Sequence, residues 1–191
     1  MIYLVRHGQT DWNIEKKTQG HTDISLNENG RNQARMLSVG IASLGIDRIV
    51  SSDLSRARET AEILNDKIGC KIELDSRLRE INYGVLEGVC RDNLTPKDWE
   101  IFNTTPEALN AEPMISVFSR IKSCFDELRE AEGNILVVTH GGALRMIMYY
   151  ASSPESFERN EYVKFCQNAK IKNAAVFKWN STMDSLQPIE F

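Results

Sequence analysis

Two short apolar segments constrain the fold of this 191-residue chain most, because each is followed, after one polar residue, by a histidine and a glycine. The first is IYLV (2–5), followed by RHG, and the second is NILVV (134–138), followed by THGG. Short apolar runs bounded by polar loops are typical of buried strands in a parallel sheet. Such strands need crossover helices, so the chain is expected to belong to the α/β class.

The rest of the chain fits this alternation of strands and helices. Helices are predicted where apolar residues recur every three or four positions, and strands where short apolar runs stand alone. Asn27, Ser52 or Asp53, and Pro113 are suitable first residues for three of these helices. The sequence therefore predicts a three-layer α/β sandwich with a largely parallel central sheet. Its helices would cover about 28–44, 53–68, 113–131 and 142–151, and its further strands 47–51, 71–74 and 173–179.

The length is suited to a single domain spanning residues 1–191. Residues 89–112 show no clean periodicity and contain Pro96 and Pro106, so they are predicted to leave the core as a lid-like excursion. The last ten residues, 182–191, are predicted to form a tail.

Composition excludes several classes of function. The net charge of −4 and the pI near 5.5 leave no electrostatic footprint for nucleic acid or an anionic membrane. No apolar run approaches the roughly 20 residues that span a bilayer, and the N-terminal stretch is not a signal peptide. The cysteines (Cys70, Cys90, Cys124 and Cys166) are far apart, so they form neither a zinc nor a redox motif. Free thiols in the cytoplasm are the expected state.

His7 and His140 are the candidate catalytic pair. Each lies just past the carboxyl end of a predicted strand, and ligands of open α/β sheets bind at that edge. If the two strands are neighbours, the imidazoles converge although the sequence separates them widely. The alternative is two unrelated histidines, each hydrogen-bonded locally.

Arg6 and Arg56 are the candidate phosphate ligands. Arg6 adjoins His7, and Arg56 lies in the first turn of the helix that follows another strand end. Two guanidiniums beside two imidazoles repel unless a dianion lies between them, and arginine binds phosphate oxygens bidentately. Asn13 adds a neutral donor from the first loop. Taken alone, Arg56 reads equally as a solvated helix charge.

Glu80, in the segment LREINYGVLEG (78–88), is the candidate proton donor. Cleavage of an ester needs a proton on the leaving oxygen, and a bound dianion beside this carboxyl would raise its pKa. The alternative is a surface ion pair with a neighbouring arginine. Glu87 is a rival carboxylate, to which the glycines around it assign a structural role in a tight loop.

Four stretches of the chain resemble, in order, the motifs of the histidine phosphatase superfamily, the phosphoglycerate-mutase-like clan. They are LVRHGQT, SSDLSRARETA, LREINYGVLEG and VVTHGGALR, and the similarity spans about residues 1–150. The resemblance implies that His7 is the nucleophile, that Glu80 is the acid/base, and that Arg6, Arg56 and His140 bind the phosphoryl group. It implies substrate contacts for Gln9, Thr10, Asn13, Gln19, His21, Tyr83 and Gly141, although His21 reads equally as an exposed loop histidine.

The resemblance implies one mechanism. Neutral His7 attacks phosphorus, the two arginines and His140 neutralise the equatorial oxygens, and Glu80 protonates the leaving alcohol and then activates water. No metal or other cofactor is expected, because the sequence has no carboxylate cluster of the kind that holds Mg²⁺. The expected ligand is a small-molecule phosphate ester; the oligomeric state cannot be read from the sequence.

The four motifs do not separate phosphatases from mutases. Mutases of the family carry a long basic insertion before the second histidine, whereas residues 89–112 here are short and rich in Asp and Glu. Such a lid would repel a second anionic group, which favours a phosphatase over a phosphoglycerate mutase. The size and the YGVLEG stretch resemble α-ribazole-phosphate and broad-specificity bacterial phosphatases most. A non-catalytic protein that binds a phospholigand remains a third possibility.

Overall fold

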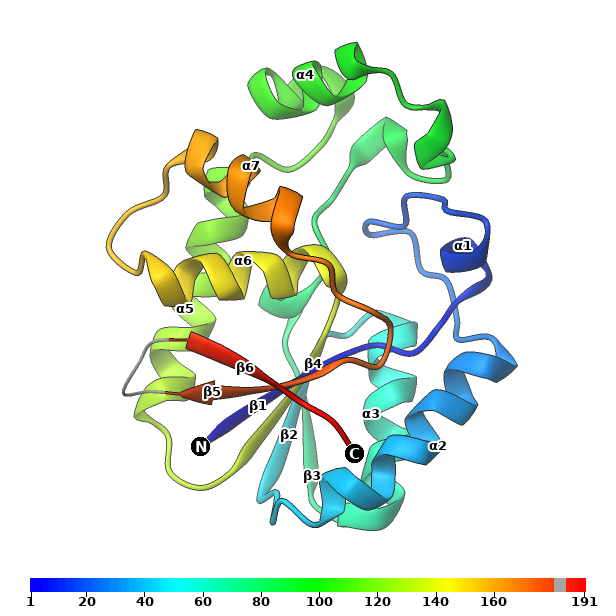
Figure 1. Ribbon diagram of the computed structural model, residues 1–191, viewed down its shortest axis with the longest axis vertical. Helices are drawn as coiled ribbons and strands as arrows, with labels where there is room; N and C mark the ends of the chain where they lie inside the picture. The colour runs from blue at the N-terminus through cyan, green and yellow to red at the C-terminus, as the bar shows by residue number, and fades with distance from the viewer. Residues whose placement is uncertain (181–184) are drawn as a thin grey trace.

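A mixed six-stranded sheet forms the centre of the protein, in the order β3-β2-β4-β1-β5-β6 (Figure 1). The computed structural model describes residues 1–180 and 185–191. Strands β1, β2, β3 and β4 are parallel to one another, whereas β5 runs antiparallel to both of its neighbours. The predicted α/β class and largely parallel sheet are confirmed. The strands are β1 (Ile2–Arg6), β2 (Arg48–Ser51), β3 (Lys71–Leu74), β4 (Ile135–Thr139), β5 (Val176–Asn180) and β6 (Ser185–Ile189).

The apolar strand residues divide between two cores, one on each face of the sheet. In β1, Leu4 belongs to one buried cluster and Tyr3 and Val5 to the other, and in β4 Val137 and Leu136 divide in the same way. Successive strand residues point to opposite faces, so a strand covered on both sides must be apolar throughout. This explains why both central strands read as continuous apolar runs.

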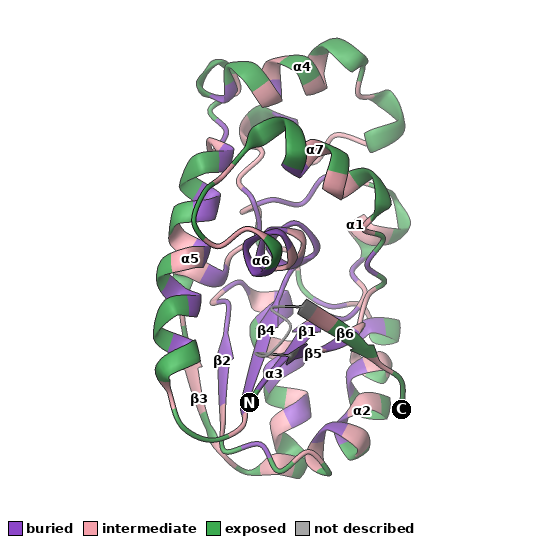
Figure 2. Cartoon of the chain, turned by 60° about the vertical axis from the view of Figure 1, so that its left-hand side comes forward, coloured by how far each residue is buried: buried purple, intermediate pink, exposed green. Residues whose placement is uncertain are grey.

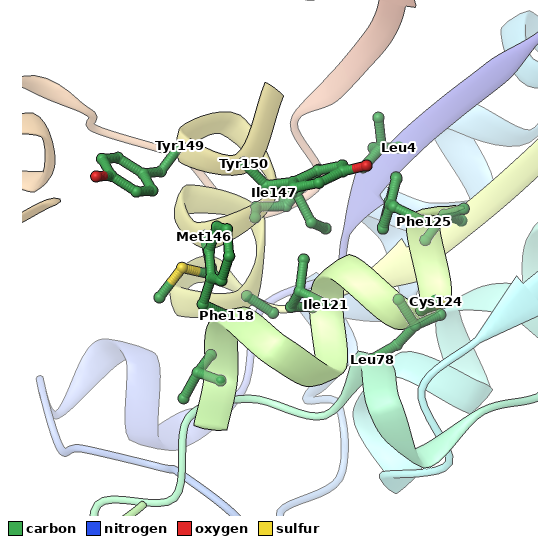
Figure 3. Close-up of a cluster of buried hydrophobic side chains, with 14 of the residues drawn as sticks. Leu4, Leu78, Phe118, Ile121, Cys124, Phe125, Met146, Ile147, Tyr149 and Tyr150 are labelled. Atoms are coloured by element: carbon green, nitrogen blue, oxygen red, sulfur yellow. The ribbon is translucent and has the colours of Figure 1, made fainter. Parts of the chain in front are cut away.

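Helices cover both faces and complete the three layers. Two pack on the face of Tyr3 and Val5, and two on the face of Leu4, where their side chains interdigitate (Figure 3). The buried stripes of α2, α3 and α5 face the sheet while their opposite sides are exposed, whereas α6 is buried over almost its whole length (Figure 2). The first pair is α2 (Glu28–Ala42) and α3 (Ser55–Ile68), and the second is α5 (Met114–Glu130) and α6 (Gly141–Ser152); α7 (Arg159–Asn168) lies beside α6.

The helix ends agree with the sequence in two places and differ in one. Asn27 caps α2 through its side chain, which accepts a hydrogen bond from the Gly30 N–H, and Pro113 immediately precedes α5. Neither Ser52 nor Asp53 caps α3, which begins after Leu54 without a side-chain cap of its own. The carboxylate of Asp23, from a distant loop, accepts the Ser55 N–H at 2.8 Å instead. A cap supplied by tertiary structure leaves no local sequence signal.

Short helices and loops gather beyond the carboxyl edge of the parallel strands, where Figure 1 shows α4, α7 and α1 around one end of the sheet. Residues 89–112 form α4 and two 3-10 turns rather than irregular chain. The remaining short elements are α1 (Asp11–Ile14), η1 (Ser76–Leu78), η2 (Gly84–Leu86), η3 (Arg91–Asn93), α4 (Pro96–Thr104) and η4 (Pro106–Leu109).

The C-terminal region departs from the prediction. Strand β5 begins at Val176 rather than at 173, because Asn173 and Ala174 hydrogen-bond to the loop after β1. The predicted tail is wrong over 185–189, which form β6 at the edge of the sheet; 182–184 lie outside the described residues. Pro188 lies within this strand, and an edge strand tolerates proline because one side of its backbone needs no partner.

Candidate functional site

Neighbouring strands bring the two predicted histidines together. Strands β1 and β4 pair in parallel with Arg6 opposite Thr139, so the residues that follow, His7 and His140, leave the sheet side by side. The His7 N–H donates to the Thr139 carbonyl at 2.9 Å, and the two imidazole centroids are 5.2 Å apart. Both side chains are buried, with exposed fractions of 2% and 0%. The predicted convergence is therefore confirmed as geometry.

One hydrogen bond assigns the tautomer of His7. Its Nδ1 atom lies 2.6 Å from the carbonyl oxygen of Gly8, which can only accept, so Nδ1 carries the hydrogen and Nε2 keeps its lone pair. Burial, followed by the charges of Arg56 and Arg6, holds the pKa of His7 well below its ordinary value. The ring is thus neutral at physiological pH and presents a nucleophilic nitrogen.

His140 has the complementary arrangement. The Nε–H of Arg56 donates to its Nδ1 at 3.2 Å, so the hydrogen is on Nε2, which donates to the Ser52 hydroxyl at 2.8 Å. Burial and the same arginine keep the pKa of His140 well below its ordinary value. Ser52 follows the carboxyl end of β2, so three neighbouring strand ends contribute to this chain of contacts.

Arg56 is an internal part of the site rather than a solvated helix charge. It is fully buried, and its two Nη groups donate to the carbonyl oxygens of Thr22 and Gly20 at 3.1 and 2.8 Å. Two carbonyls and one imidazole fix the guanidinium but do not neutralise it, which leaves its positive charge uncompensated by an adjacent anion.

Arg6 immediately precedes His7, and only part of its guanidinium is hydrogen-bonded. Its Nη1 donates to the Ile171 carbonyl at 2.6 Å, whereas its Nε is buried without a hydrogen-bond partner. Burial is the main reason that the pKa of Arg6 falls to about 10, which still leaves it charged at neutral pH. A Cβ at Gly141 would lie 3.3 Å from this Nε, so glycine there allows the guanidinium to approach the start of α6. A buried donor without a partner is a ready ligand for an anion.

The carboxylate of Glu80 is held by the backbone at the start of α6. Its Oε1 accepts the N–H groups of Ile81 at 3.0 Å and Ala143 at 3.1 Å, and its Oε2 accepts that of Gly142 at 3.0 Å. The side chain is buried, with an exposed fraction of 9%. The alternative of a surface ion pair is therefore wrong for this residue.

The pKa of Glu80 corrects one sequence-based expectation. Burial alone raises it, but the N–H bonds from Gly142 and Ile81 and the charges of Arg56 and Arg6 together lower it below the ordinary value. A bound dianion would therefore raise the pKa of Glu80 from a value that is lowered in the protein without ligand. The sequence could not show this, because the Gly142 N–H reaches Glu80 only through the place where α6 begins.

Glu87 has the structural role that the sequence assigned to it. Its two carboxylate oxygens accept the backbone N–H groups of His21, Thr22 and Tyr83 at 2.9, 2.8 and 3.1 Å. His21 itself donates from Nε2 to the Glu80 carbonyl at 2.9 Å. The structure therefore places His21 behind the backbone of Glu80, where it positions this segment.

The polar residues of the first loop are mostly bound to one another. Thr10 and Asn13 form the capping box of α1, and the Oδ1 of Asn13 also accepts from Asn173 at 3.1 Å. A phosphate oxygen would therefore reach Asn13 only through its Nδ2. Gln9 accepts from two asparagine side chains at the start of α2. Gln19 is buried, and its side-chain oxygen has no partner, which suits a ligand or water.

Two adjoining cavities open at this end of the sheet, the smaller of them beside Arg6 and Glu80. The smaller, of about 200 Å³, is lined by Arg6, Glu80, Gly141, Gly142, Lys170 and Ile171. The larger, of about 470 Å³, is lined mainly by apolar side chains of the 81–83 loop, α4, α5 and α7. Tyr83, Arg91 and Arg145 line both, so they form the boundary between the two cavities.

Residues 89–112 do not present an acidic face to these cavities, which corrects the charge argument made from the sequence. Asp92 pairs with a lysine at 2.6 Å, Asp98 caps α4, and Glu112 pairs with an arginine at 2.8 Å. From residues 89–112 the cavity lining takes Arg91 and the side chains of Trp99, Phe102 and Asn103. A count of charges over the segment could not show which of them point inward.

Several residues of the site carried weak or no sequence signals. Ser52 follows a strand end, the same signal that identified the histidines, and Arg145 lies one turn after the THGG motif. Asn173, which donates to the His7 and Gly8 carbonyls at 3.2 and 3.3 Å, had no motif around it.

Over residues 1–180 and 185–191, no group of three or more His, Cys, Asp or Glu side chains is arranged to hold a metal ion. Within those same ranges no helix is long and apolar enough to cross a membrane.

Comparison with known proteins agrees with this geometry. Residues 2–180 match the family model of the histidine phosphatase superfamily (branch 1). Among curated proteins, "Probable phosphoglycerate mutase GpmB" of Escherichia coli is 36% identical over 179 residues, covering 89% of this chain and 83% of that protein.

Solved structures that resemble this chain include both a phosphatase and a mutase by name. A mycobacterial glucosyl-3-phosphoglycerate phosphatase in complex with VO3 superposes with a TM-score of 0.81 at 25% identity, covering 98% of this chain and 96% of that one. YhfR of Bacillus stearothermophilus gives 0.78 at 26% identity, with coverage of 98% and 94%. The phosphoglycerate mutase of Thermus thermophilus gives 0.73 at 26% identity, with coverage of 100% and 98%.

Proposed function

This chain belongs to the histidine phosphatase superfamily (branch 1), and on that premise we propose that it is a phosphatase that hydrolyses small-molecule phosphate monoesters through a phosphohistidine at His7. Relatives of this chain include proteins named as phosphatases and as mutases, so hydrolysis rather than isomerisation is the proposed part. The observation that carries the proposal is the state of His7, a buried neutral imidazole whose Nδ1 is bound to the Gly8 carbonyl. Its free Nε2 is the nitrogen that attacks phosphorus.

The reaction has two steps. In the first, the Nε2–P bond forms as the ester P–O bond breaks, and Glu80 gives its proton to the leaving alcohol. In the second, Glu80 takes a proton from water, whose oxygen attacks phosphorus and releases His7 and inorganic phosphate. The charge of the bound phosphate raises the pKa of Glu80 from its lowered value, so that the carboxyl holds a proton in the first step.

Arginines supply the electrostatic stabilisation in this proposal. Arg56 and Arg6 are both charged and both close enough to lower the pKa of His7. They neutralise the equatorial oxygens in a buried site, where preorganised charges are worth most. His140 completes the phosphoryl site by exchanging its Nε2–H bond to Ser52 for one to a phosphoryl oxygen, while Arg56 keeps its Nδ1, and no metal is needed for these steps.

The proposed ligand and compartment follow from the cavities and thiols. Cavities of about 200 and 470 Å³ suit a small molecule. The net charge of −4 argues against nucleic acid or an anionic membrane as a partner. The four free cysteines suit the reducing cytoplasm.

A phosphoglycerate mutase is the second candidate, and two observations favour it. The Escherichia coli relative has that name, and the basic residues Arg91 and Arg145 beside the phosphate cavity suit a substrate carboxylate. The larger cavity argues against a mutase. It has a volume of about 470 Å³ and mostly apolar walls, and glycerate would leave it unfilled.

The test compares the two activities in one experiment. The protein is incubated with 3-phosphoglycerate, with and without 2,3-bisphosphoglycerate as primer, and 2-phosphoglycerate and free phosphate are both measured. A parallel incubation uses 2-phenylethyl phosphate, which cannot isomerise. We expect phosphate release from both esters and little 2-phosphoglycerate. Interconversion much faster than phosphate release would replace the phosphatase by the mutase.

A further inference from the structure

The two adjoining cavities describe more of the substrate than its phosphate. The smaller one is lined by Arg6 and Glu80, two residues of the proposed phosphoryl site, and the larger one adjoins it at Tyr83. An ester bound with its phosphate in the smaller cavity must therefore direct its alcohol portion toward the larger one. The walls met along this path define the chemistry of that portion.

The far cavity is built for an apolar group. The Tyr83 and Phe102 rings stack at a centroid distance of 5.1 Å, and Trp99 meets Phe102 edge-on at 5.9 Å. Aliphatic and sulfur-containing side chains complete the wall, among them Ile81, Met114, Val163 and Cys166. Its volume of about 470 Å³ lies within the range of ligand sites, which bind mostly through apolar contact. Asn103 and Gln167 are polar residues of the same lining, but most of the wall is apolar, so a polar alcohol would exchange its hydration for few hydrogen bonds.

The boundary between the cavities carries positive charge that the phosphate does not require. Arg145 is fixed there by a hydrogen bond of 2.9 Å from its Nε to the Ala169 carbonyl, and Arg91 is held through its backbone N–H, which donates to the Lys16 carbonyl. Arg6 and Arg56 already match a phosphate dianion, and Glu80 is the one carboxylate among the residues that line the two cavities. Arg91 and Arg145 are thus placed to bind a further anionic group.

We propose that the preferred substrate is a phosphate monoester whose alcohol carries an acidic group close to the ester oxygen, for Arg91 and Arg145, and an apolar body of aromatic size beyond it. This inference deepens the proposed function and rests on it. The acidic group anchors the ester at the boundary, and the apolar body fills the cavity between α4 and α7. Neither feature alone matches both sets of walls.

Four esters test the proposal as a two-by-two set. They are the phosphates of 3-phenyllactate (carboxylate and ring), lactate (carboxylate only), 2-phenylethanol (ring only) and ethanol (neither). We expect each added group to raise kcat/KM by roughly 10–100-fold, the usual worth of a buried aromatic ring or of hydrogen bonds to a charged group. The phenyllactate ester should therefore be the best substrate of the four.

Two variants assign the effects to their residues. Arg145→Gln should reduce the preference for each carboxylated ester over its uncharged counterpart, while keeping the preference for the ring. Trp99→Ala should do the reverse. Lys164→Gln, which removes an exposed charge from α7 outside the cavity lining, should change neither preference.

The outcomes separate this inference from the proposed function. If the four esters are hydrolysed with kcat/KM values within about threefold of one another, the inference is wrong and the phosphatase proposal stands. A gain from the ring alone or from the carboxylate alone also overturns it. If no ester releases phosphate, the proposed function itself fails.

Discussion

The substitution Glu80→Gln separates two roles that this carboxylate combines. Glutamine keeps the size of the side chain but not its acceptors, because the two oxygens of Glu80 accept three backbone N–H groups. The best arrangement leaves the amide oxygen at the Oε1 position, where it keeps the bonds from Ile81 and Ala143. The amide NH₂ then faces the Gly142 N–H, so that a donor opposes a donor.

The expected magnitudes differ between stability and chemistry. One lost bond to a buried N–H should lower the free energy of unfolding by about 1–3 kcal/mol. Loss of the transferable proton should slow phosphorylation of His7 by an alkyl phosphate by roughly 10²–10⁴-fold. p-Nitrophenyl phosphate should be slowed much less, because p-nitrophenolate leaves without a proton. Vanadate should bind more tightly, since the variant removes a negative charge beside Arg6 and Arg56.

The matched control is Glu87→Gln. Glu87 is a partly buried carboxylate that, like Glu80, accepts several backbone N–H groups, but it holds the 21–22 loop rather than the start of α6. It should lose comparable stability and slow both substrates by the same factor. Phosphoenzyme formation is followed in single-turnover quench experiments with 2-phenylethyl phosphate and p-nitrophenyl phosphate, and stability by denaturant unfolding.

The ratio of the two phosphorylation rates decides the question. If Glu80→Gln slows both substrates equally, Glu80 only positions the phosphate, and the assignment of the proton donor is wrong. If Glu87→Gln shows the larger dependence on the leaving group, the donor is Glu87 instead.

Other predictions follow from the same site. Hydrolysis of p-nitrophenyl phosphate should survive EDTA and be blocked by vanadate, because guanidiniums neutralise the transition state; activity lost in EDTA and restored by Mg²⁺ would contradict this. The ring protons of His7 and His140 should show no titration by NMR between pH 5.5 and 8, because both pKa values lie well below 6.5, and a midpoint near 6.5 would refute the burial argument. The unfolded chain binds the protons that these folded rings exclude, so the free energy of unfolding should fall by roughly 1 kcal/mol per histidine between pH 7.5 and 5.5. His140→Gln should remove half of that dependence, and an unchanged pH profile would show that His140 is not buried in its neutral form.

The central strands, the main helices and the meeting of the two histidines could be predicted from the sequence, because their signals are local. Apolar runs such as 134–138 mark strands buried on both faces, and the helix stripes of α2, α3 and α5 follow ordinary periodicity. The meeting of His7 and His140 followed from one further rule, that the carboxyl ends of neighbouring parallel strands share an edge.

The parts that the sequence missed depend on tertiary structure. The cap of α3 comes from Asp23, and the pKa of Glu80 depends on N–H groups at a helix start far along the chain. The acidic residues of 89–112 were wrongly expected to face the substrate, because Asp92 and Glu112 form ion pairs with a lysine and an arginine from other parts of the chain. Helix α7 had a readable signal in Tyr162, Phe165 and Cys166, which lie three and four positions apart.

The identity of the phosphorylated atom tests the central claim most directly. Rapid quench during turnover, followed by mass spectrometry and NMR of the labelled peptide, locates the phosphoryl group and distinguishes the two ring nitrogens. The account predicts phosphate on Nε2 of His7, stable in alkali and labile in acid, because Nδ1 is occupied by its hydrogen bond to Gly8. Phosphate on His140, on a serine or on a carboxylate, or on Nδ1 of His7, would contradict it.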